Sequence, residues 1–165
     1  MNTPPTTSLA ILAGGQSTRI GTDKAVIRLD GERLIDILIR RFADKAEHIM
    51  LSARDDYGTG LPIIPDDPQA PGGPVGAIFS LADRLQAMGI DGFVTVPVDA
   101  PFAPADLIER LTASGGCAVA EDGRRMHPTL PIGAPPSSTR FGGPTTMRSG
   151  RLLCSGWPGN AERRR

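Results

Sequence analysis

The sequence has little cysteine, no net charge and no long apolar run near its start. Its two cysteines, Cys117 and Cys154, stand far apart in a chain of 165 residues, which argues against a disulfide framework and against a thiolate metal site. Equal numbers of acidic and basic residues give no reason to expect nucleic acid or a membrane surface as a partner. Residues 9–13 are too few for a signal sequence or a membrane span, so we expect a cytoplasmic protein.

The charge is nevertheless unevenly distributed along the chain. Residues 134–165 hold six arginines and one glutamate among many proline, glycine and serine residues, whereas residues 1–133 carry an excess of acidic groups. A segment of that composition without helical or strand periodicity is typical of a loop or of disorder. We therefore expect one folded domain over residues 1–133 and a poorly ordered tail over residues 134–165.

Short apolar segments alternate with amphipathic ones along the predicted domain. We expect strands at residues 8–13, 48–53, 61–64, 92–97, 117–120 and 129–132, and helices that begin near residues 34, 71 and 104. This order predicts an α/β protein with a three-layer Rossmann-like fold and a mostly parallel sheet. In such folds a ligand binds at the carboxyl ends of the strands.

A glycine pair follows the first expected strand. Gly14 and Gly15 would let the backbone approach a ligand closely, and Arg19 and Lys24 supply cations that suit phosphate oxygens. The string LAGGQSTRIGTDK at residues 12–24 is neither a Walker A loop nor the GxGxxG of dinucleotide-binding folds, which makes a plain NAD-binding module the least favoured interpretation. A lone glycine pair is more often an ordinary turn.

Acidic groups and a histidine occupy other expected loops. Asp66 and Asp67 precede a PGGP string that opens a helix, and such a pair is more often a capped turn than a ligand site. Asp99 ends an expected strand, where a carboxylate can hold Mg²⁺ together with water and phosphate, or can simply be solvated. His127 is as easily a surface histidine as a phosphate contact.

Taken in order, these strings resemble the molybdenum cofactor guanylyltransferases. The resemblance covers residues 8–133 and rests on four motifs: LAGGQSTRIGTDK with the later LDGERL, IPDDPQAPGGPVGAI, VPVDAPF and EDGRRMHPT. Relatives that transfer cytidylyl or sugar-linked groups usually have alanine where Gly14 stands, so Gly14 favours guanine. The family resemblance therefore implies a nucleotidyltransferase.

The resemblance also implies a set of site residues. GTP would be bound by Leu12, Ala13, Gly14, Gly15, Lys24, Asp66, Gly73 and Asp99. Arg19, Lys24 and Asp99 would be catalytic, with Mg²⁺ as the cofactor on Asp99. Asp67 is the near alternative to Asp66, and His127 would lie toward the pterin.

The implied reaction is attack by the terminal phosphate of molybdopterin on the α-phosphorus of GTP. It releases pyrophosphate and leaves a guanine dinucleotide, and it needs alignment and charge stabilisation rather than a nucleophilic side chain. The implied partners are GTP and molybdopterin, with cofactor-delivery proteins or molybdoenzymes as further candidates, and neither nucleic acid nor membrane.

The sequence departs from the family pattern at two places. Residues 51–54 read LSAR where the family often has an asparagine that contacts the nucleotide, so that contact is lost or is made by Ser52. After Gly133 the family's closing elements are not recognisable. GC-rich codons read in a shifted frame would give this composition, and a natural short variant is the alternative. Two other functions stay open: a relative that uses CTP or another NTP, and a remnant that binds GTP without transferring it.

Overall fold

A computed structural model of the protein describes residues 7–14, 23–70, 73–90, 92–113, 119–121 and 126–131. For residues 113, 119–121 and 126–131 we consider the backbone alone. The site predictions for Gly15 and Arg19, and the predicted tail, lie outside the described residues.

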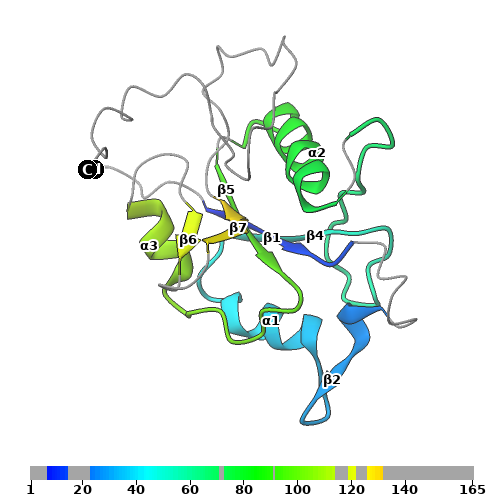
Figure 1. The fold of residues 1–165 in the computed structure, drawn as a ribbon, viewed down its shortest axis with the longest axis vertical. Helices are drawn as coiled ribbons and strands as arrows, with labels where there is room; N and C mark the ends of the chain where they lie inside the picture. Colours follow the sequence, from blue (N-terminus) through cyan, green and yellow to red (C-terminus); the bar gives the residue numbers. More distant parts are fainter. Residues whose placement is uncertain are drawn as a thin grey trace.

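The centre of the fold is a parallel sheet in the strand order β4-β1-β5 (Figure 1). The strands are β1 (Ser8–Leu12), β4 (His48–Ser52) and β5 (Phe93–Pro97). The register sets Leu12 opposite both Ser52 and Pro97, so the carboxyl ends of the strands reach the same edge of the sheet. Parallel sheets have both faces covered, and every residue of β1 is buried.

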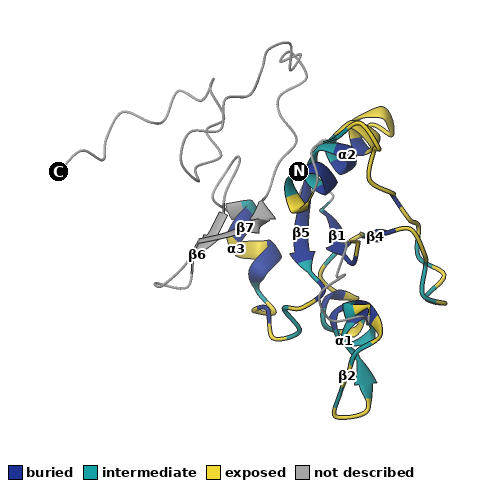
Figure 2. Cartoon of the chain, turned by 45° about the vertical axis from the view of Figure 1, so that its right-hand side comes forward, coloured by how far each residue is buried: buried dark blue, intermediate teal, exposed yellow. Residues whose placement is uncertain are grey.

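Helices cover the two faces of this sheet (Figures 1 and 2). The helices α1 (Leu34–Phe42) and α3 (Leu107–Ala113) pack on one face, and α2 (Pro74–Ala87) packs on the other. Successive side chains of a strand point to opposite faces. Accordingly, Leu9 and Ile11 belong to the cluster with α1, whereas Ala10 and Leu12 belong to the cluster with α2. None of the described helices is both long and apolar enough to span a bilayer.

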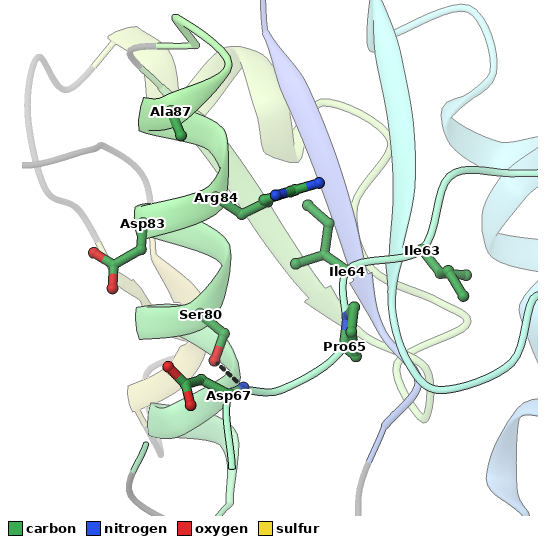
Figure 3. A pocket seen from close by; sticks show the side chains of 8 residues that line it. All are labelled: Ile63, Ile64, Pro65, Asp67, Ser80, Asp83, Arg84 and Ala87. Atoms are coloured by element: carbon green, nitrogen blue, oxygen red, sulfur yellow. Dashed lines mark hydrogen bonds between the residues drawn. The ribbon is translucent and has the colours of Figure 1, made fainter. Parts of the chain in front are cut away.

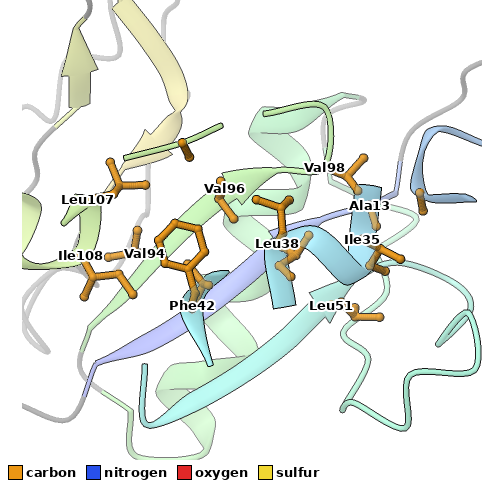
Figure 4. Packing of buried hydrophobic residues seen from close by; sticks show 14 of the residues in the cluster. Ala13, Ile35, Leu38, Phe42, Leu51, Val94, Val96, Val98, Leu107 and Ile108 are labelled. Atoms are coloured by element: carbon orange, nitrogen blue, oxygen red, sulfur yellow. The ribbon is translucent and has the colours of Figure 1, made fainter. Parts of the chain in front are cut away.

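The cluster on the α1 side, part of which is drawn in Figure 4, is the larger of the two. Leu38 and Phe42 of α1 lie against Val94 and Val96 of β5. The spacing that predicted an apolar face on this helix therefore buries Leu38 and Phe42, as expected. The predicted three-layer α/β architecture is thereby confirmed.

Two elements differ from the expectation, one because of its proline residues and the other because its strands are very short. The segment at residues 61–64 forms a parallel bridge between Ile63 and Leu51 instead of a strand, since Pro62 and Pro65 on either side cannot donate to a ladder. A short antiparallel hairpin was not predicted. It joins β2 (Arg28–Leu29) and β3 (Glu32–Arg33) through an Asp30-Gly31 turn, and two-residue strands are too short to show an alternating pattern.

Other boundaries shift by a few residues. The helix expected from residue 104 begins at Leu107, after a pair of turns. The two strands expected last are β6 (Val119–Glu121) and β7 (Met126–Pro131), which pair with each other antiparallel and outside the central sheet. The backbone of β7 lies next to β5.

We expect Leu81→Ala on α2 to lower the free energy of unfolding by about 2–5 kcal/mol. Leu81 is fully buried between α2 and the sheet, and truncation leaves a cavity. Urea denaturation would measure the loss. Met88→Ala is the control, because Met88 is 60% exposed just after α2 and should change stability by about 0.5 kcal/mol or less. Equal losses in both variants would contradict the packing of α2 on this face.

Candidate functional site

The end of β1 is held against the end of β4 by two hydrogen bonds to one oxygen. The backbone nitrogens of Ala13 and Gly14 both donate to the carbonyl oxygen of Ser52, at 3.1 and 2.7 Å. A Cβ atom at Gly14 would lie 3.1 Å from that oxygen, which belongs to the backbone and cannot swing away. Glycine at this position therefore permits a close approach of the two strand ends.

Lys24 and Asp99 meet just beyond the sheet, although they are 75 residues apart. Lys24 opens the short 3-10 helix η1 (Lys24–Val26), and Asp99 follows β5, which a hydrogen bond from the Val98 nitrogen to the Leu12 oxygen holds to β1. The Nζ atom of Lys24 lies 2.7 Å from Oδ2 of Asp99, and the side chains are 38% and 51% exposed. A pair this exposed contributes about 0–1 kcal/mol to folding. Both charges can therefore turn to a ligand at little cost to the fold.

The structure separates the two neighbouring aspartates that precede α2. Asp66 lies beside the end of β4, with its Oδ1 atom 3.4 Å from the hydroxyl of Ser52. Asp67 instead stabilises the local turn before α2. Its Oδ1 atom accepts a hydrogen bond from the Gln69 nitrogen at 2.8 Å, and its backbone nitrogen donates to Ser80 Oγ at 2.8 Å. The geometry therefore favours Asp66 over Asp67 as a ligand-binding group at the sheet edge.

Gly73 turns the chain into α2. Its φ of 84° and ψ of −168° belong to a region open almost only to glycine, and a Cβ atom there would meet nothing within 4 Å. Backbone conformation, not crowding, is what requires glycine. Glycine at position 73, which was predicted to lie against the nucleotide, is therefore also required by the local backbone conformation.

Several predicted site residues come together at the carboxyl edge of the sheet: Leu12, Ala13, Gly14, Lys24, Asp66 and Asp99. His127 stands in β7, opposite Ala120, and its position toward a pterin stays a prediction because its side chain is not among those described. Gly15 and Arg19 lie outside the described residues.

Sequence reasoning missed Tyr57 and Asp23. The Tyr57 hydroxyl donates to Oδ2 of Asp23 at 2.7 Å, and Oδ1 of Asp23 accepts from the Ala25 nitrogen at 3.0 Å at the start of η1. Burial, and then the hydrogen bond to Asp23, raise the pKa of Tyr57 well above its ordinary value, so the hydroxyl stays protonated as a donor. The signal that could have found this pair is slight: a polar turn with a lone tyrosine, and an aspartate next to Lys24.

Asp99 belongs to no cluster of three potential metal ligands in the part of the chain that the structure describes. Within the described ranges, no three side chains of His, Cys, Asp or Glu gather closely enough to hold a metal ion. Mg²⁺ commonly binds proteins through one or two carboxylates and keeps its remaining ligands as water and substrate phosphate. A half-exposed aspartate at a strand end, outside any such group of three, fits that mode of binding and does not fit a cage made of protein ligands.

A groove of about 520 Å³ runs elsewhere, between α2 and the segment that follows the Ile63 bridge (Figure 3). It is lined by Ile63, Ile64, Pro65, Asp67, Ser80, Asp83, Arg84 and Ala87. Figure 3 shows Arg84 reaching from α2 toward Ile64, with the hydrogen bond between Ser80 and Asp67 at one end. Because the groove includes neither Lys24 nor Asp99, it is distinct from the sheet-edge residues.

The chain resembles known proteins over most of its length. A molybdenum cofactor guanylyltransferase of Cereibacter sphaeroides is 42% identical over 125 residues, which cover 72% of this chain and 64% of that protein. One from Rhodobacter capsulatus is 40% identical over 108 residues, or 63% of this chain and 56% of that protein. The matched part thus spans less than two thirds of these relatives.

The fold has counterparts among solved structures. The crystal structure of molybdopterin-guanine dinucleotide biosynthesis protein A from Archaeoglobus fulgidus matches with a TM-score of 0.57 and 22% identity, over 77% of this chain and 67% of that one. At that identity the match bears on the fold alone, and it agrees with the Rossmann-like architecture. The model of the MobA-like NTP transferase domain matches residues 9–143. The chain therefore belongs to the family of MobA-like NTP transferases.

Proposed function

We propose that the protein is a cytoplasmic nucleotidyltransferase that moves the GMP unit of GTP onto the terminal phosphate of molybdopterin. The observation that carries the proposal is the exposed pair of Lys24 and Asp99, 2.7 Å apart at the carboxyl edge of the sheet. Relatives that are 42% identical are named molybdenum cofactor guanylyltransferases, which supports the choice of both substrates. The partners are accordingly GTP and molybdopterin, with cofactor-delivery proteins or molybdoenzymes downstream.

The chain's contribution to this reaction is alignment and positive charge. An oxygen of the molybdopterin phosphate forms a bond to the α-phosphorus of GTP, and the bond from that phosphorus to the bridging oxygen breaks as pyrophosphate leaves. Lys24 turns from Asp99 to the phosphates, and Arg19 adds a second cation. Leu12, Ala13, Gly14, Gly15, Asp66 and Gly73 hold the nucleotide, and His127 lies toward the pterin.

Asp99 is the residue that would hold Mg²⁺. The metal supplies positive charge that offsets the charge of the triphosphate as it reacts. Since the carboxylate is paired with Lys24 and belongs to no group of three or more potential metal ligands among the described side chains, we expect Mg²⁺ to bind together with the nucleotide rather than alone.

Replacement of Asp99 by asparagine should reduce Mg²⁺-dependent release of pyrophosphate by about 100- to 1,000-fold. The amide keeps the shape of the side chain but removes the negative charge that would hold the metal. A bound metal stabilises the charge of the transition state by several kcal/mol, and this stabilisation is lost with it. Pyrophosphate release from GTP in the presence of molybdopterin is the measurement. Asp44→Asn is the matched control, because Asp44 is 75% exposed after α1 and should leave the rate unchanged. Full activity of the Asp99 variant would refute the role given to it.

Calorimetric titration separates the proposed enzyme from its alternatives. We expect the protein to bind GTP with Mg²⁺ more tightly than CTP with Mg²⁺, and then to release pyrophosphate when molybdopterin is added. Tighter binding of CTP would point to a relative with another base preference. Binding of GTP without any release of pyrophosphate would point to a protein that holds the nucleotide but does not complete the transfer.

Gly14→Ala should weaken GTP binding by about three- to tenfold. The new Cβ atom pushes on the Ser52 carbonyl at 3.1 Å, and displacement of the strand ends by a few tenths of an ångström misaligns the site. Gly92→Ala serves as the control, because a Cβ atom there meets nothing within 4 Å. The same titration compares the two variants, and equal affinities for GTP would show that the close approach at Gly14 is unimportant.

A further inference from the structure

The polar loop that follows β4 carries Tyr57, which contacts residues on either side of the predicted phosphate-binding segment at residues 14–22. Its Tyr57 hydroxyl donates to Oδ2 of Asp23 at 2.7 Å and lies 3.4 Å from the carbonyl oxygen of Ala13. Ala13 precedes Gly14 and Gly15, and Asp23 precedes Lys24. One hydroxyl therefore links the chain just before the predicted phosphate-binding segment to the chain just after it.

The backbone of Tyr57 is held in a conformation that tyrosine seldom adopts. Its φ of 53° lies in the left-handed region, where residues other than glycine are uncommon and often serve a function. Two contacts impose this conformation: the Tyr57 nitrogen donates to Oδ1 of Asp55 at 2.6 Å, and Nη1 of Arg33 donates to the Tyr57 oxygen at 2.7 Å. The side chain is thus aimed by contacts on both sides of its backbone.

Arg33 is itself held in place, so the hydrogen bond that it donates to the Tyr57 oxygen comes from a side chain of fixed orientation. The guanidinium of Arg33 donates to both carboxylate oxygens of Asp36 on α1, at 2.6 and 2.7 Å. Such two-pronged pairing restricts the orientation of arginine more than a single contact does. A chain of contacts therefore runs from α1 through Arg33 to Tyr57 and on to Asp23.

Asp23 passes this restraint to Lys24. One of its carboxylate oxygens accepts a hydrogen bond from the Tyr57 hydroxyl, and the other accepts one from the Ala25 nitrogen and so caps η1. The residues on both sides of Lys24 are therefore held by hydrogen bonds. The Lys24 side chain, in contrast, pairs among the described residues with the exposed carboxylate of Asp99, and such an ion pair restrains a long side chain weakly. The position of Lys24 thus depends on its backbone more than on that pair.

We propose that Tyr57 is a positioning residue that, through Asp23, sets the place of Lys24 against the nucleotide phosphates. The inference rests on the proposed binding of GTP at this edge. Tyr57 touches no substrate in this role. It keeps the two ends of the phosphate-binding segment together, so that Lys24 meets the triphosphate in a prepared position.

The test is the affinity of the full chain for GTP with Mg²⁺ after Tyr57→Phe. We expect affinity to fall about five- to tenfold, which is the size of the effect of one ordinary hydrogen bond, and KM for GTP to rise more than kcat falls. Thr59→Val is the matched control. It removes another hydroxyl of the same loop, which donates to the Asp56 oxygen at 2.7 Å, and it should change affinity less than twofold.

A double-variant comparison distinguishes positioning from general support of the loop. If Tyr57 acts through Lys24, Tyr57→Phe should have little further effect on GTP affinity in a Lys24→Gln protein. The same loss with and without Lys24, or an equal loss in Thr59→Val, overturns the inference. Wild-type affinity in Tyr57→Phe overturns it while leaving the proposed function intact. Failure of the wild-type protein to bind GTP overturns both.

Discussion

The parallel pairing of β1 with both β4 and β5 is the constraint on which the rest of the structure depends. Because the neighbours run in the same direction, the segments that follow the three strands emerge at one edge of the sheet. Both faces of β1 are buried, so a slip of one residue would exchange the side chains that face α1 for those that face α2. Burial thus locks the register, and the register positions the strand ends.

The groups at that edge are held by contacts of two kinds. Backbone hydrogen bonds to Ser52 keep Gly14 in place with little freedom, whereas the pair of Lys24 and Asp99 is exposed and contributes little to folding. A rigid frame that carries loosely paired charges is suited to a polyanionic substrate, because the charges can change partners while the frame stays aligned. Tyr57 belongs to the frame, since its contacts are made with other protein groups.

Much of the fold could be predicted because its signals are local. The apolar spacing of α1 and the short apolar runs of β1 and β5 reflect burial that the structure confirms. Gly14, Lys24, Asp66 and Asp99 could be proposed from motif strings at predicted strand ends, and the match to the MobA-like NTP transferases agrees with those strings. The hairpin at Asp30 and Gly31 and the role of Tyr57 could not, because very short strands show no alternation and a lone tyrosine in a polar turn matches no motif.

The sequence by itself determined the order of the main helices and strands, the family, and the residue types available for phosphate and metal. It did so because periodicity and short motifs depend on near neighbours along the chain. Only the tertiary structure decided which distant groups meet: Lys24 with Asp99, Tyr57 with Asp23, and Asp66 rather than Asp67 with Ser52. These meetings follow from strand order, register and loop path, which are set by the packing of the whole domain and leave no trace in local spacing.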